Sequence, residues 1–154
     1  NAAATAAEVL ASAGVDLPLP EAATVAYEDR AAAGRAIQEP LYGDEVEQVF
    51  SALPEPFNRV VPQLLTAGAF GEFETRGGLD VAMRELISLV AIAALGVAAQ
   101  MRPHVAGAIR AGNSRQKVAA ALVQVLPYIG GPYALSGLVL VATYDENDSS
   151  EAYR

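Results

Sequence analysis

The sequence lacks several residue types that carry chemistry in other proteins. Its 154 residues include no cysteine and no tryptophan, and only one histidine, His104. Without cysteine there is no disulfide, no thiolate nucleophile and no thiol redox chemistry. A single histidine also excludes the common metal sites that are built from several imidazoles, so we expect no metal. The chemistry of this chain must come from carboxylates, arginines and one imidazole.

Basic residues are scarce, and Lys117 is the only lysine. Ten Lys and Arg residues oppose 18 Asp and Glu residues, which gives a net charge of −8 and an isoelectric point near 4.5. Nucleic-acid phosphates are bound by clustered Lys and Arg, so this balance argues against nucleic acid as a partner. Residues 1–7 have neither the basic region nor the continuous apolar region of a signal peptide, and we expect a cytoplasmic protein.

Apolar residues, in contrast, are abundant. Hydrophobic residues make up 53% of the chain, and the mean hydropathy is +0.27, which is high for a soluble monomer. Val118 to Tyr144 carries no charge, but the two prolines and two glycines of 127–132 divide this run. The pieces are shorter than the ~20 residues that a membrane-spanning helix needs. We therefore expect no membrane contact, and burial of this surface between subunits of a homo-oligomer.

The residue pattern predicts an all-α fold of six to eight helices. Alanine is abundant, glycine and proline separate the periodic blocks, and no segment alternates as a strand does. Asp44, Asp80 and Ser114 stand where helix N-caps are expected. Pro103 suits the first turn of a helix, and Gly71 to Gly78 is expected to be a loop. Helices are expected over about 3–13, 21–37, 45–52, a segment from 57, 80–96, 103–112, 114–126 and 133–143.

The whole chain, 1–154, is expected to be a single domain. Residues 1–55 form looser N-terminal helices in this interpretation, and residues 56–143 form the core. The helices after Asp80 supply most of the apolar mass of that core. One buried helix face is predicted ahead of them by an i, i+3, i+4, i+7, i+8 stripe: Phe57, Val60, Val61, Leu64 and Leu65.

One acid and one imidazole flank an apolar run. Glu85 is the last charged residue before Leu86 to Met101, which carries no charge, and His104 follows that run. A carboxylate at the rim of an apolar layer and a lone imidazole are suited to acid–base chemistry. Glu85 could equally be an ordinary acid favoured by the positive end of a helix dipole. His104 could equally be a surface or core histidine with one backbone hydrogen bond.

Three arginines lie close to this pair in the sequence. Arg76, Arg84 and Arg102 could hold the carboxylate of a substrate, because guanidinium groups bind carboxylates through paired hydrogen bonds. Arg84 and Arg102 could equally be solvated or could neutralise Glu85.

A set of short motifs follows in order between about Phe57 and Leu138: Phe70-Gly71-Glu72, Arg76-Gly77-Gly78-Leu79-Asp80, Arg84-Glu85-Leu86, His104, Ala108, Gly112 and Tyr128-x-Gly130-x-Pro132. This ordered set resembles the carboxymuconolactone decarboxylase family, which also contains the alkylhydroperoxidase D-like proteins. The resemblance implies a single-domain helical bundle of the alkylhydroperoxidase D-like type. It also implies assembly as dimers and trimers of dimers, so we expect a homotrimer or a hexamer.

The peroxidase branch of that family has a Glu twelve residues before a CxxCxxxH motif. Counting back from His104 places the two cysteine positions at Val97 and Gln100, and the acid at Glu85. Both cysteines are absent, so thiol peroxidase activity is excluded. The resemblance then implies the branch without redox cysteines, which needs no cofactor.

The resemblance and the Glu85–His104 pair together predict a cofactor-independent, decarboxylase-like lyase. Its substrate would be a small carboxylated lactone or oxo acid, with Glu85 and His104 transferring protons. Two alternatives remain open: a non-catalytic ligand-binding or scaffold protein of the same fold, and a lactone hydrolase or cyclase of a biosynthetic pathway. The residues expected to bind the substrate or line its cavity are Arg76, Arg84, Arg102, Val97 and Gln100.

Overall fold

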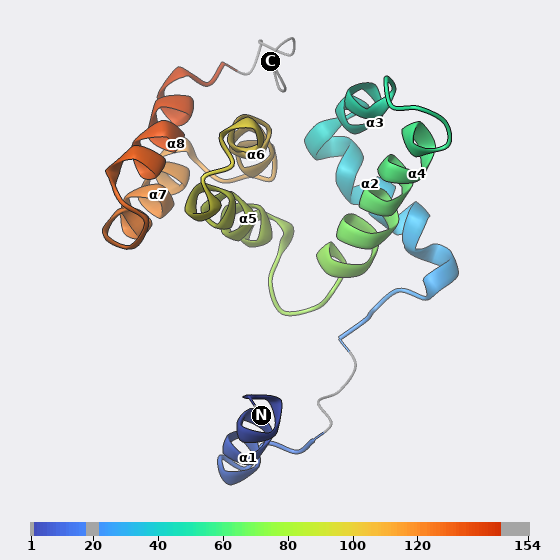
Figure 1. Ribbon diagram of the computed structural model, residues 1–154, viewed down its shortest axis with the longest axis vertical. Coiled ribbons are helices and arrows are strands. Elements are labelled where there is room, and N and C mark those ends of the chain that lie inside the picture. The colour runs from blue at the N-terminus through green and yellow to red at the C-terminus, as the bar shows by residue number, and fades with distance from the viewer. Residues whose placement is uncertain (1, 18–21, 146–154) are drawn as a thin grey trace.

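The computed structural model describes residues 2–17 and 22–145. It is 76% helical, and the described residues form eight α-helices and no strand, which confirms the all-α prediction (Figure 1). A short 3-10 turn, η1 (Tyr27–Asp29), precedes the second helix, and a π-helix, η2 (Leu65–Glu74), continues the fourth. The helices are α1 (Ala2–Ser12), α2 (Arg30–Tyr42), α3 (Glu45–Phe50), α4 (Phe57–Leu64), α5 (Val81–Leu95), α6 (Ala98–Arg110), α7 (Arg115–Ile129) and α8 (Gly131–Thr143).

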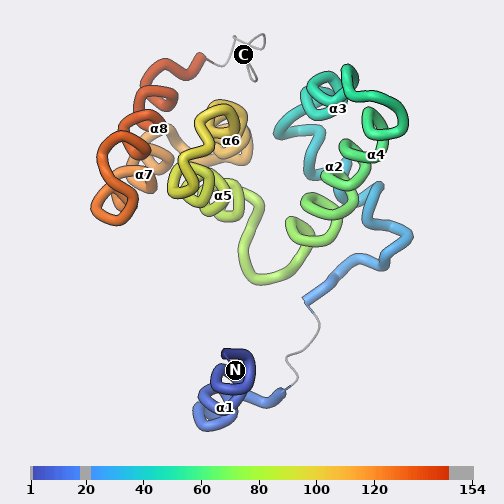
Figure 2. The backbone as a smooth tube through the Cα atoms, in the orientation of Figure 1, coloured from blue at the N-terminus to red at the C-terminus, as the bar shows by residue number. Residues whose placement is uncertain are grey.

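The larger apolar core lies among α5, α6, α7 and α8, as the sequence predicts. These four helices form one group in Figures 1 and 2, and α5 carries the acid while α6 carries the imidazole. Burial of apolar side chains is the main favourable term in packing such helices. The buried members of this core are Leu86, Leu89, Ala93, Met101, Val105, Ala108, Val118, Leu122 and Val141.

A second, smaller core holds α2 against η2. Glycines permit close backbone contact there: a Cβ on Gly34 would collide with the Thr66 carbonyl oxygen, and one on Gly71 with that of Arg30. Leu41, Tyr42 and Val46 are the buried residues of this cluster. The packing fixes the end of α2, and with it Tyr42, next to α6.

The expected helix over 21–37 begins later and ends later than predicted. In α2 the helix starts at Arg30 and runs through Pro40 to Tyr42. Residues 22–26 are not helical, and the Thr24 hydroxyl donates a hydrogen bond to the Thr75 carbonyl oxygen at 2.6 Å. The 3-10 turn η1 follows them and leads into α2. Pro40 has no backbone N–H, so α2 lacks the hydrogen bond that residue 40 would otherwise donate to the Ala36 carbonyl oxygen.

Three other expectations about the helices were wrong. The stripe that starts at Phe57 is not a buried face of this chain, since Phe57 is 56% exposed and Leu64 is 67% exposed. The expected loop over 71–78 is helical up to Glu74, because η2 extends the turn that α4 begins. The helix α6 starts at Ala98, so Pro103 is its sixth residue and does not lie in its first turn.

The first helix differs from the others in its surroundings. No residue of α1 is buried, and Figures 1 and 2 show it apart from the other helices. Within residues 2–17 and 22–145, no helix is both long enough and apolar enough to cross a bilayer.

Candidate active site

Side chains from three helices meet at one point. Tyr42 ends α2, Glu85 is the fifth residue of α5, and His104 lies in the middle of α6. The Tyr42 hydroxyl donates a hydrogen bond to Glu85 Oε2 at 2.6 Å and lies 3.1 Å from His104 Nδ1. Glu85 Oε2 and His104 Nδ1 are 3.6 Å apart. The acid and the imidazole singled out in the sequence are therefore neighbours, and a phenol bridges them.

The cluster is buried on one side and accessible on the other. Tyr42 and Glu85 are each 3% exposed, whereas the side chain of His104 is 25% exposed. The start of α5 positions the acid, because Asp80 caps that helix by accepting a hydrogen bond from the Met83 amide at 2.8 Å. His104 is thus the most accessible member of the cluster.

The space for this contact exists because residue 107 has no side chain. A Cβ on Gly107 would lie 2.7 Å from Tyr42 Cζ and 2.8 Å from Glu85 Oε2, and it would also collide with the Tyr42 hydroxyl. Gly107 follows His104 by three residues on α6, so it lies on nearly the same helix face.

The hydrogen bonds assign the protons of the cluster. A phenol has one proton, and Tyr42 uses it to donate to Glu85. The Tyr42 oxygen then accepts from His104, which requires that Nδ1 of the ring carries a hydrogen. With this tautomer, Nε2 is the ring nitrogen that could exchange a proton with a ligand, and the Glu85 carboxylate could stabilise positive charge on the ring through Tyr42.

A second acid belongs to the same environment. Burial raises the pKa of the Glu74 carboxyl above its ordinary value of 4.5, and the negative charge of Glu85 raises it further, while Arg84 and His104 lower it. Glu74 is the last residue of η2. Its Oε2 atom is enclosed and has no hydrogen-bond partner among the described residues.

A cavity of about 310 Å³ opens beside His104. It lies between α2, α3, η2 and α6 and is open on one side, and most of its wall is apolar. Gln100 lines it, whereas Val97, which precedes α6, does not, and Glu85 lies behind Tyr42. The lining residues are Tyr42, Val46, Phe50, Leu65, Ala69, Phe70, Gln100 and His104.

The three arginines serve other contacts or face elsewhere. Arg76 pairs with Glu72 at 2.9 Å. Arg84 donates hydrogen bonds to the carbonyl oxygens of Leu79, Arg76 and Gly77, which holds the loop before α5. Arg102 precedes His104 by two residues, about 200° around the helix, so it points away from the cavity side of α6. None of the three lines the cavity.

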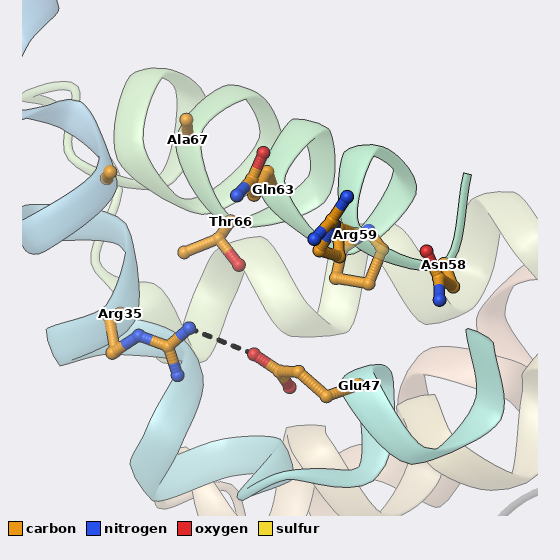
Figure 3. A pocket seen from close by; sticks show the side chains of 9 residues that line it. Arg35, Glu47, Asn58, Arg59, Gln63, Thr66 and Ala67 are labelled. Carbon is orange, nitrogen blue, oxygen red and sulfur yellow. Dashed lines mark hydrogen bonds and ion pairs between the residues drawn. The ribbon is translucent and has the colours of Figure 1, made fainter. Parts of the chain in front are cut away.

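Another hollow, of about 530 Å³, lies between α2, α3, α4 and η2 (Figure 3). Several polar side chains line it, and the Arg35–Glu47 ion pair of 2.9 Å spans it, as the dashed line in Figure 3 shows. Neither Glu85 nor His104 lines this hollow. The cavity beside His104 is therefore the better candidate for chemistry.

Sequence reasoning missed Tyr42, Glu74 and Gly107. Tyr42 precedes Glu85 by 43 residues, and no local pattern marks it as a partner of that acid. Gly107 did carry a signal, since a glycine inside an expected helix often marks close packing.

Comparison with known families now places the chain. The model of the carboxymuconolactone decarboxylase family matches residues 60–143, more than half of the sequence, so the chain belongs to this family. No curated protein matches the sequence. The matched segment contains Glu85 and His104 but begins after Tyr42, Val46 and Phe50. These three residues, which precede it in the sequence, also line the cavity.

Proposed function

We propose that this member of the carboxymuconolactone decarboxylase family is a cofactor-independent lyase that decarboxylates a small carboxylated lactone or oxo acid. The observation that carries the proposal is the bridged cluster, in which the Tyr42 hydroxyl joins Glu85 Oε2 at 2.6 Å to His104 Nδ1 at 3.1 Å. This cluster faces a largely apolar cavity through His104. A poised proton carrier at the wall of such a cavity is typical of acid–base catalysis.

Decarboxylation requires that one proton is delivered to one carbon atom of the substrate. The carbon–carbon bond to the carboxylate breaks, carbon dioxide leaves, and the electron pair stays on the substrate as an enolate. His104 in its doubly protonated form then gives the Nε2 proton to the enolate carbon. Before this transfer, Glu85 stabilises the positive ring through Tyr42, and after it the neutral ring keeps its Nδ1 hydrogen bond.

Lactone hydrolysis is a second candidate, and Gln100 favours it. Gln100 and His104 are four residues apart on α6 and both line the cavity. The amide of Gln100 offers a hydrogen-bond donor for a carbonyl oxygen while His104 Nε2 takes a proton from water. In this reaction water adds to the acyl carbon and the ring oxygen leaves with a proton.

The experiment measures carbon dioxide release from a panel of carboxylated lactones and β-oxo acids. Glu85→Gln, His104→Gln and Tyr42→Phe should each lower kcat at least about 100-fold, the usual minimum for loss of acid–base catalysis. Glu39→Gln, a change at an exposed acid of α2, is the matched control and should leave the rate unchanged. Ring opening without carbon dioxide release would identify the hydrolase instead. Binding without any turnover by the wild-type protein would identify a non-catalytic ligand-binding protein.

A further inference from the structure

We infer that the cavity beside His104 selects a monocarboxylic acid with an apolar body and rejects a substrate that carries a second carboxylate. This inference rests on the proposed function, because it names the substrate class of the same site. It follows from the distribution of polar and apolar side chains around the cavity.

The polar groups of the cavity are gathered on one side. Gln100 and His104 lie one turn apart on α6, and Tyr42 is hydrogen-bonded to His104. A carboxylate or a carbonyl group of the substrate finds hydrogen-bond donors only there. His104 is also the only residue of the lining that can carry a positive charge.

The rest of the wall cannot hold a charge. It consists of the side chains that α3 and η2 contribute, and none of them has a hydrogen-bonding group. An unpaired carboxylate placed against such a wall loses its hydration without compensation, which is costly. These residues are Val46, Phe50, Leu65, Ala69 and Phe70.

The size of the cavity supports the same class of substrate. About 310 Å³ is at the lower end of the range for small-molecule sites. One ring or short apolar chain next to one carboxylate fills such a space. A second carboxylate would have to lie against the apolar wall, because the polar side is already occupied by the reacting group.

The reaction of such a substrate balances without a further ion. In a β-oxo acid, the bond between the α-carbon and the carboxylate breaks and its electron pair becomes the enolate. The proton from His104 Nε2 forms the new carbon–hydrogen bond, and water later returns a proton to the ring. The carboxylate that meets the polar side is the group that departs, so no negative charge remains in the apolar part.

The single histidine makes the test direct, because His104 gives the only imidazole signal in an NMR spectrum of the protein. The probes are 3-phenylpropionate, a monocarboxylate with an apolar body, and glutarate, a dicarboxylate of similar length. Titration of the wild-type protein should shift the His104 resonance saturably with 3-phenylpropionate, with a Kd at least about tenfold lower than for glutarate. Ala69→Phe fills the cavity and should abolish the shift, whereas Ala36→Phe, at an exposed position of α2 outside this cavity, should not.

Equal or tighter binding of glutarate would overturn the inference, and so would a failure of both probes to shift the resonance. A shift by 3-phenylpropionate that survives in Ala69→Phe would place the ligand outside the cavity and would also overturn it. A different result would contradict the proposed function. If benzoylacetate releases carbon dioxide no faster with the wild-type protein than with Glu85→Gln, the site is not a decarboxylase, even where the binding preference holds.

Discussion

Gly107 permits the closest contact of the site, and its replacement gives a sharp prediction at the residue scale. In Gly107→Ala the new methyl group would overlap Tyr42 and Glu85, which are both buried. Forcing an extra methyl group into a packed interior costs about 1–3 kcal/mol. We expect a loss of that size in the free energy of unfolding, measured with urea, and a large fall in kcat because the Tyr42 bridge is displaced.

Gly68→Ala is the control for this change. Gly68 also lies in a helical segment, but a Cβ there would meet nothing within 4 Å. Alanine is up to about 1 kcal/mol better than glycine inside a helix, so this variant should be as stable as the wild-type protein or more stable. A Gly107→Ala protein that matched Gly68→Ala in stability and kept full activity would contradict the geometry of the site.

Glu74 predicts a pH-dependent effect whose sign follows from its raised pKa. Well below pH 4.5 the carboxyl is protonated in both the folded and the unfolded chain, so it carries no penalty there. As the pH rises, the unfolded chain releases this proton more readily than the folded protein does, and folding becomes less favourable. Glu74→Gln cannot ionise, and it should therefore be more stable than the wild-type protein at neutral pH.

Unfolding curves of both proteins between pH 4 and pH 8 check this prediction. The advantage of Glu74→Gln should shrink toward zero as the pH falls to 4.5 and below. Glu39→Gln, the exposed control, should follow the wild-type protein throughout. A Glu74→Gln protein that was less stable than the wild-type protein at neutral pH would mean that the Glu74 carboxylate is stabilised in the folded state.

The sequence could single out Glu85 and His104 as candidates because each stands at the edge of an uncharged run, and the structure places them 3.6 Å apart. Tyr42 could not be found in that way. Its bond to Glu85 depends on how α2 packs against α6, and that packing is set by contacts between residues far apart in the chain. The arginines show the reverse case. Their closeness to Glu85 and His104 in the sequence suggested that they bind a substrate carboxylate. In the structure Arg76 pairs with Glu72, and Arg84 donates to a backbone carbonyl oxygen.

At the scale of elements, two aspartates with a similar sequence context differ in whether they cap a helix. Both Asp44 and Asp80 precede helices, and the sequence favours both as N-caps. Only Asp80 makes the capping hydrogen bond, and Asp44 makes no side-chain cap. Asp80→Ala should lower the free energy of unfolding by about 1 kcal/mol.

Asp44→Ala serves as its matched control and should change the stability by less than about 0.5 kcal/mol, as exposed substitutions away from special contacts do. Chemical unfolding of both variants gives the comparison. Equal losses would mean that Asp44 caps α3 in solution. A negligible loss in Asp80→Ala would remove the argument that this cap positions Glu85.

Prolines account for most of the errors in the helix boundaries. Pro40, Pro62, Pro103 and Pro127 all lie inside described helices, although a proline usually predicts a helix end. A proline removes one backbone hydrogen bond, and tertiary packing can outweigh that loss. Glycines were more reliable, since Gly96 ends α5 in the left-handed conformation, as the sequence predicts.

At the scale of the whole molecule, the segment that matches the family supplies only part of the cavity wall. The family match begins at residue 60, whereas Tyr42, Val46 and Phe50 lie before it. The matched segment contains Glu85 and His104, the acid and the imidazole that the sequence singles out as candidates. The upstream segment supplies much of the cavity wall, whose shape depends on the packing of α2 and α3.

The exposed apolar surface leads to the last prediction, which concerns assembly. Met83, Ile87 and Leu95 follow one another at intervals of four or eight residues along α5, and Ile87 is 50% exposed while Leu95 is 77% exposed. A continuous apolar stripe of this kind is typical of an interface between subunits. We expect light scattering to give three or six times the chain mass of 16.0 kDa at micromolar concentration. Ile87→Glu should lower that mass, because a carboxylate buried in the interface would be unpaired, whereas Gln48→Glu at an exposed position of α3 should not. A 16.0 kDa particle for the wild-type protein would show that the stripe faces solvent.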